Sequence, residues 1–92
     1  MIIGYTTGTF DLLHPGHLEF LKTSKAMCDR LIVGLTSDRL AVIQKRKPFF
    51  SYQHRYDLLS VLKYVDSVIE HDGQTKDEAY KMFFFSYTFY WK

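Results

Sequence analysis

Three short runs of strand character, separated by segments with helical spacing, constrain the fold of this chain more than any other feature. They lie at residues 2–6, 31–35 and 65–70, and each has strand length and β-branched side chains. Alternating strands and helices are typical of parallel strands joined by crossover helices. The sequence therefore predicts an α/β fold, a Rossmann-like three-layer arrangement around a parallel sheet.

Local signals place helices between and after these runs. Pro15 suits a first helical turn, because its missing N–H needs no partner there. The hydroxyls of Ser37, Ser51 and Thr75 can cap three further helices. The expected helices are residues 15–27, 38–44, 52–62 and 75–82.

The end of the chain shows neither helical spacing nor the alternation of a strand. Seven of the nine residues in 83–91 are aromatic, and none is acidic. Such bulk does not suit a buried fourth strand, so a sheet of three strands is expected. We predict one domain over residues 1–82, a tail over 83–92 without assigned structure, and a sheet that is incomplete at its C-terminus.

Composition excludes several classes of protein. The 92 residues allow one domain, and the net charge of +2 is too weak to indicate a nucleic-acid partner. No run approaches the roughly 20 apolar residues of a membrane span, and the N-terminus lacks the basic region of a signal peptide. The single cysteine, Cys28, fits a reducing compartment, so a cytoplasmic location is expected.

Ligands of open α/β sheets bind beyond the carboxyl ends of the strands. In this chain those ends carry residues 7–17, 36–47 and 71–73. A turn containing Gly8 and a basic loop containing Lys45 are therefore expected on the same rim.

The sequence His-Pro-Gly-His at 14–17 stands at an expected helix start. The first N–H groups of a helix are unpaired and partly positive, so they favour an anion. Gly16 allows a phosphate to approach the backbone, and His14 and His17 lie on one face of the first turn. The alternative is that the histidines cap or pack, but their position after a strand and a glycine turn favours a phosphate site.

A metal site is not expected from the same residues. Two histidines at this spacing lack the third and fourth ligands of a zinc site. The other two histidines, His54 and His71, are remote in sequence.

Five segments carry a resemblance to a known family. They are GTFD at 8–11, HPGH at 14–17, KRKP at 45–48, SYQHR at 51–55 and YVDSVIE at 64–70. Over about residues 2–81 the chain resembles the cytidylyltransferase-like nucleotidyltransferases, and within them the glycerol-3-phosphate cytidylyltransferases. The first two segments are highly specific for the superfamily, and the others point less firmly to that branch.

The resemblance implies direct, in-line attack of a small phosphorylated acceptor, such as glycerol 3-phosphate, on the α-phosphate of CTP. Pyrophosphate leaves with Mg²⁺ assisting, and no covalent enzyme intermediate forms. His14 and His17 would hold the triphosphate, and Thr9 and Phe10 with the adjacent backbone would line the nucleotide pocket. Asp11 would order the motif or help to organise the metal. The family also implies a homodimer.

Each of three further positions has two interpretations, one functional and one structural. Arg55 would contact the acceptor phosphate or the triphosphate, and otherwise is a surface arginine. Asp66 matches an acidic family position near the site, and otherwise is structural. In the basic loop, Gln44 stands where relatives often carry lysine, while Lys45 and Arg46 remain to bind phosphate; otherwise the loop is simply solvated.

The resemblance stops where the family continues with another strand and a segment that closes over the triphosphate. The hypothesis is therefore a C-terminally truncated cytidylyltransferase. Two alternatives stay open: a catalytically impaired module that binds nucleotide or self-associates, and an adenylyltransferase of the same superfamily.

Overall fold

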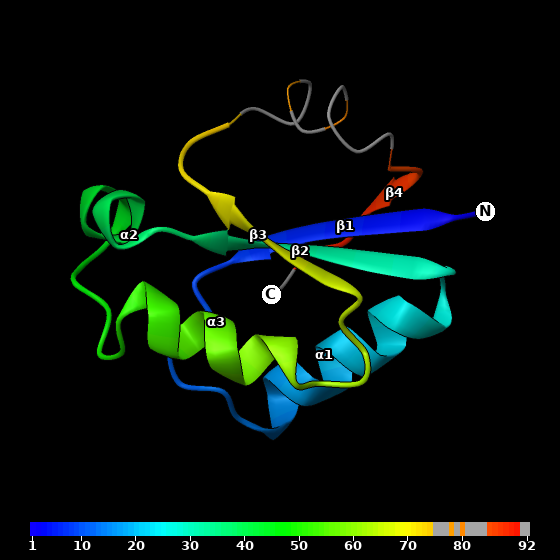
Figure 1. The fold of residues 1–92 in the computed structure, drawn as a ribbon, viewed down its shortest axis with the longest axis horizontal. Coiled ribbons are helices and arrows are strands. Elements are labelled where there is room, and N and C mark those ends of the chain that lie inside the picture. Colours follow the sequence, from blue (N-terminus) through cyan, green and yellow to red (C-terminus); the bar gives the residue numbers. More distant parts are fainter. Residues whose placement is uncertain (75–77, 79, 81–84, 91–92) are drawn as a thin grey trace.

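A parallel four-stranded sheet forms the centre of the computed structural model, which describes residues 1–74, 78, 80 and 85–90 (Figure 1). Its strands are β1 (Ile3–Gly8), β2 (Arg30–Thr36), β3 (Ser67–His71) and β4 (Tyr87–Thr88), in the order β3-β2-β1-β4. All three pairings are parallel. The predicted Rossmann-like α/β fold is confirmed.

The helices between the strands are α1 (Pro15–Ala26), α2 (Asp38–Gln44) and α3 (Tyr52–Ser60). Two of the three predicted caps are present: Leu40 N donates to Ser37 Oγ at 3.1 Å, and His54 N donates to Ser51 Oγ at 3.3 Å. The third, Thr75, lies outside the described residues. The predicted helix over 75–82 falls largely outside the described residues. None of the helices that the structure describes has the length and apolar character to cross a bilayer.

Apolar side chains cover both faces of the sheet. Helices α1 and α3 lie along one face (Figure 1), where Leu21 of α1 and Leu59 of α3 pack against β2 with no exposed surface. On the other face Tyr5 and Ile32 form a smaller cluster. The ring of Phe85 stacks on Tyr5 at 4.8 Å between centroids, so the aromatic tail covers part of this second face.

The expectation of a three-stranded sheet was wrong. Strand β4 pairs with β1 through Gly4↔Tyr87 and Tyr5↔Thr88, and Ser86 N donates to the carbonyl of Ile3 at 2.6 Å. The expectation assumed a strand buried on both faces. At the edge of the sheet bulk is tolerated, because side chains such as Tyr87, 56% exposed, extend into solvent.

The parallel register gathers the carboxyl ends of β1, β2 and β3 at one end of the sheet, where α2 also lies (Figure 1). Asp66 precedes β3 and therefore lies at the opposite end. Its Oδ2 accepts hydrogen bonds from Lys25 Nζ at 2.7 Å and from Leu31 N at 2.8 Å. Of its two interpretations, the structure supports the structural one.

Candidate functional site

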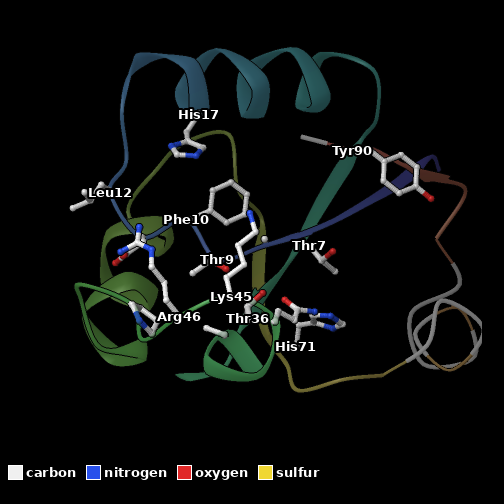
Figure 2. Close-up of a pocket in the computed structure, with 15 residues that line it drawn as sticks. Thr7, Thr9, Phe10, Leu12, His17, Thr36, Lys45, Arg46, His71 and Tyr90 are labelled. Atoms are coloured by element: carbon white, nitrogen blue, oxygen red, sulfur yellow. The ribbon is translucent and has the colours of Figure 1, made fainter. Parts of the chain in front are cut away.

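A cavity of about 520 Å³ opens where the three strands end (Figure 2). Its walls come from the strand ends, the segment leading into α1 and the loop after α2. Seven of the predicted site residues line it: Gly8, Thr9, Phe10, Asp11, His17, Lys45 and Arg46. Segments distant in sequence thus meet on the predicted rim.

The two histidines of the motif have different positions. His14 is the N-cap of α1, where its Nδ1 accepts a hydrogen bond from Gly16 N at 3.0 Å. Its own N lies 3.4 Å from His17 Nδ1, and the two rings are 4.0 Å apart between centroids. Only His17 lines the cavity, so His14 orders the helix start beside it.

The structure places Gly16, where a phosphate was expected to approach the backbone, outside the cavity lining. Its N–H donates to the side chain of His14. Capping satisfies an N–H group that the first turn would otherwise leave unpaired. The structure therefore supports the capping interpretation of His14, and it places His17 in the cavity lining.

Phe10 adopts an unusual backbone conformation at the centre of the site. Its φ of +47° lies in the left-handed region, which is uncommon for a residue with a side chain. The ring is 5% exposed and meets His17 edge-on at 5.5 Å. A Cβ at Gly8 would lie 2.7 Å from Phe10 Cε2, so glycine at position 8 makes room for this ring.

Asp11 joins the motif to the end of the basic loop. Its Oδ2 accepts from Phe49 N at 2.7 Å and its Oδ1 accepts from Phe50 N at 2.8 Å. Partial burial raises the pKa of this carboxyl, but the two N–H donors and the charges of Arg55 and Arg46 outweigh it, so the pKa is lowered. Of its two predicted roles, the geometry supports ordering of the motif.

The structure places Arg55 beneath the cavity rather than in its lining. Its side chain is fully buried. Its guanidinium donates to the carbonyls of Thr9, Thr36 and Phe50 at 2.8–3.0 Å and to Asp38 Oδ1 at 2.7 Å. A buried arginine needs such partners, and these hold together three segments that surround the cavity.

The loop after α2 turns cations toward the cavity. Figure 2 shows the side chains of Lys45 and Arg46 on the same wall, and Gln44 also lines it. This placement favours a phosphate-binding role over a solvated loop. Lys47, the third cation of the run, is outside the lining.

Sequence reasoning missed several lining residues, of which His71 bears most on chemistry. It ends β3 and lines the cavity on the side of Thr7 and Thr36, away from His17 (Figure 2). Burial lowers the pKa of His71, although Asp72 and a hydrogen bond with Gln74 oppose this. Burial and the neighbouring His14 likewise lower the pKa of His17, although a hydrogen bond with Leu12 opposes this. Position 71 belongs to the strand ends at which a ligand was expected. Tyr90 lines the same cavity, but nothing in the sequence around it indicated this.

Lowering the pH from about 7.5 to about 5.5 is expected to reduce the free energy of unfolding. The pKa values of His17 and His71 lie below the ordinary 6.5, so the unfolded chain binds protons that the folded chain does not. This contribution is complete above pH 6.5 and is lost as the pH falls toward the folded pKa values. Urea unfolding at both pH values measures it.

A double variant, His17→Asn with His71→Asn, provides the control and should lose less stability over the same interval. Three carboxyls, Asp11, Asp66 and Asp72, have a pKa lowered below the ordinary 3.8, so they affect stability only in a lower pH range. Equal stability at the two pH values, or an undiminished loss in the double variant, contradicts this explanation.

Among the described residues, no three histidine, cysteine, aspartate or glutamate side chains are grouped so that they could hold a metal ion. The carboxylate of Asp11 already accepts two backbone hydrogen bonds.

The chain is similar to several known proteins. The family model described as cytidylyltransferase-like matches residues 5–83. Glycerol-3-phosphate cytidylyltransferase of Staphylococcus aureus is 41% identical over 78 residues, which are 83% of this chain and 59% of that protein. Bifunctional protein HldE of Hyphomonas neptunium is 46% identical over 79 residues, which are 84% of this chain and 16% of that protein.

A solved structure agrees with these matches. The lipopolysaccharide core biosynthesis protein of Thermoplasma volcanium is 35% identical and superposes with a TM-score of 0.82, covering 89% of this chain and 67% of that one. The curated relatives above extend well beyond the region they share with this chain, since the match spans less than two thirds of either.

Proposed function

The chain belongs to the cytidylyltransferase-like family, and from this we propose that it transfers CMP from CTP to a small phosphorylated acceptor, with glycerol 3-phosphate as the first candidate. The observation that carries the proposal is the cavity at the strand ends, which has His17 on one wall and Lys45 and Arg46 on another. A triphosphate needs such a concentration of donors and positive charge.

The proposed reaction is a single displacement. An oxygen of the acceptor phosphate forms a bond to the α-phosphorus of CTP, and the bond from that phosphorus to the bridging oxygen of the β-phosphate breaks. Pyrophosphate leaves with the electron pair, and no bond to the protein forms. Mg²⁺ enters bound to the nucleotide. Such a transfer depends on positioning and on neutralisation of charge, which this cavity can provide.

Each cavity residue has a proposed task. His17 donates a hydrogen bond to the phosphate oxygens around the reacting phosphorus, while Lys45 and Arg46 neutralise the charge of the leaving pyrophosphate. Asp11 and Arg55 act as positioning residues, because they fix the loops that carry these groups. Thr9 and Phe10 line the nucleotide pocket.

A Gln44→Lys variant is expected to bind MgCTP roughly tenfold more tightly. Gln44 lines the cavity beside two cations, and a lysine there would add a charge-assisted hydrogen bond to phosphate. Calorimetric titration of both proteins measures the change. Lys47→Gln, which removes a cation outside the lining, is the matched control. Unchanged affinity in Gln44→Lys contradicts a triphosphate position beside this loop.

The alternatives are a module that binds nucleotide or self-associates without turnover, and an adenylyltransferase. Pyrophosphate release from CTP or ATP, with glycerol 3-phosphate and Mg²⁺, distinguishes them. Release from CTP supports the proposal, whereas release from ATP alone indicates the adenylyltransferase. CTP binding without release above a His17→Ala control indicates the binding module.

We also propose that the chain forms a homodimer and acts in the cytoplasm. Apolar side chains such as Ile2 and Met1 are exposed beside the sheet, as is common at interfaces. Light scattering at tens of micromolar protein tests the dimer, and a monomer at that concentration counts against it.

A further inference from the structure

The Nδ1 atom of His71 is buried and has no hydrogen-bond partner among the described residues. A buried polar atom without a partner destabilises the folded protein unless a ligand or water completes it. The imidazole itself lines the cavity. A ligand of Nδ1 requires the ring to turn toward the cavity, and the side-chain torsion that turns a histidine ring is soft.

Gln74 lies beside His71 and is itself held by two hydrogen bonds. Asp72 N donates to Gln74 Oε1 at 2.7 Å, and Gln74 Nε2 donates to the carbonyl of Glu70 at 3.3 Å, so the orientation of this amide is fixed. The hydrogen bond between His71 and Gln74 raises the histidine pKa, as it does when the imidazole donates. Nδ1 is the ring nitrogen that has no hydrogen-bond partner among the described residues. A neutral imidazole that donates from Nε2 presents a lone pair at Nδ1.

Packing holds the base of His71 in place. A Cβ at Gly34 would lie 2.8 Å from Tyr5 Oη, 3.0 Å from Thr7 Cγ2 and 3.4 Å from His71 Cβ. The sheet surface beneath the imidazole is therefore filled, and glycine at this position leaves room for His71 and Thr7 above it. His71 therefore packs over Gly34 of the sheet and lines the cavity.

The cavity separates charged from neutral groups. Lys45 and Arg46 lie on one wall, while Thr7, Thr36 and His71 lie together on another side (Figure 2). Phosphate groups are attracted to the cations, and a neutral acceptor is left for a group that donates a hydrogen bond. A hydroxyl is the donor that a nucleotide or a polyol phosphate offers.

We propose that His71 is a specificity residue whose Nδ1 accepts a hydrogen bond from a hydroxyl of the bound substrate, supplied either by the ribose of the nucleotide or by a polyol phosphate acceptor. The proposal rests on the proposed function, because it assigns a part of the same substrates to the neutral side of the same cavity.

Two pairs of probes separate the sources of the hydroxyl. MgCTP is compared with the magnesium complex of 2′,3′-dideoxy-CTP, and glycerol 3-phosphate with propyl phosphate, by calorimetric titration of the full chain. Wild type is expected to prefer the hydroxylated member of one pair roughly tenfold. The pair that shows the preference identifies the source.

Three variants test whether His71 is responsible. His71→Phe removes the acceptor but keeps a ring, and should abolish the preference. His71→Asn keeps an acceptor near the position of Nδ1, and should retain most of it. His54→Phe changes a histidine outside the cavity lining and should leave the preference for the hydroxylated probe unchanged. The preference of wild type is measured without any variant, so it does not depend on how well His71→Phe folds.

The outcomes separate this proposal from the proposed function. No preference in wild type, or equal preferences in wild type and His71→Phe, overturns the role of His71. If wild type still releases pyrophosphate from CTP in that case, the proposed function stands. Binding of none of the four probes overturns both.

Discussion

A His17→Ala variant is expected to catalyse nucleotidyl transfer roughly 100- to 1000-fold more slowly than wild type while remaining folded. His17 is the motif histidine that lines the cavity, and its lowered pKa keeps it a neutral hydrogen-bond donor at pH 7. Removing a donor directed at charge that develops during the reaction affects turnover more than substrate binding. Pyrophosphate release at saturating CTP and acceptor measures the loss.

The matched control is His54→Ala. His54 lies on α3, stacks on Phe50 with ring centroids 4.3 Å apart, and does not line the cavity. We expect its turnover to stay within a few-fold of wild type. If His17→Ala retains the turnover of His54→Ala and still binds CTP, His17 is not the group that stabilises the reacting phosphates.

An Arg55→Met variant is expected to lose about 3–5 kcal/mol of unfolding free energy. Methionine fills much of the same space, but it leaves the carbonyls of Thr9, Thr36 and Phe50 without their donors. Domains of this size have only about 5–15 kcal/mol in total. Urea unfolding followed by circular dichroism measures the loss.

A second arginine offers a direct comparison. Arg39 pairs with Asp72 at 2.9 Å, but its side chain is 61% exposed, whereas that of Arg55 is fully buried. Exposed pairs contribute about 0–1 kcal/mol, so Arg39→Met should cost no more than that. Equal losses of unfolding free energy in the two variants would show that burial does not determine how much Arg55 contributes to stability.

The parts that the sequence predicted are those determined by neighbouring residues. Ser37 and Ser51 cap their helices through N–H groups three positions ahead, and Pro15 begins α1 because its ring fits the first turn. The runs of strand character gave the strands to within a few residues. The motif around His17 also lies within one turn of helix, so its position in the site was predictable.

The parts that it missed depend on contacts between distant residues. Asp11 bonds to N–H groups 38 and 39 positions away, and Arg55 to a carbonyl 46 positions away. Nothing in the local sequence of Arg55 shows that backbone acceptors surround it. The short strand at Tyr87 was missed for the same reason, because β1 rather than local spacing determines its conformation.

Pairing of β1 with β4 also has a consequence during synthesis. Ile3 and Ser86, which join these strands, are 83 positions apart. A ribosome adding about 5–20 residues per second takes on the order of ten seconds to cover that distance. For this time one edge of the first strand made has no neighbour, and an unpaired edge invites pairing with other chains. Chaperones that shield β1 at this stage would therefore raise the yield of folded protein more than those acting after release.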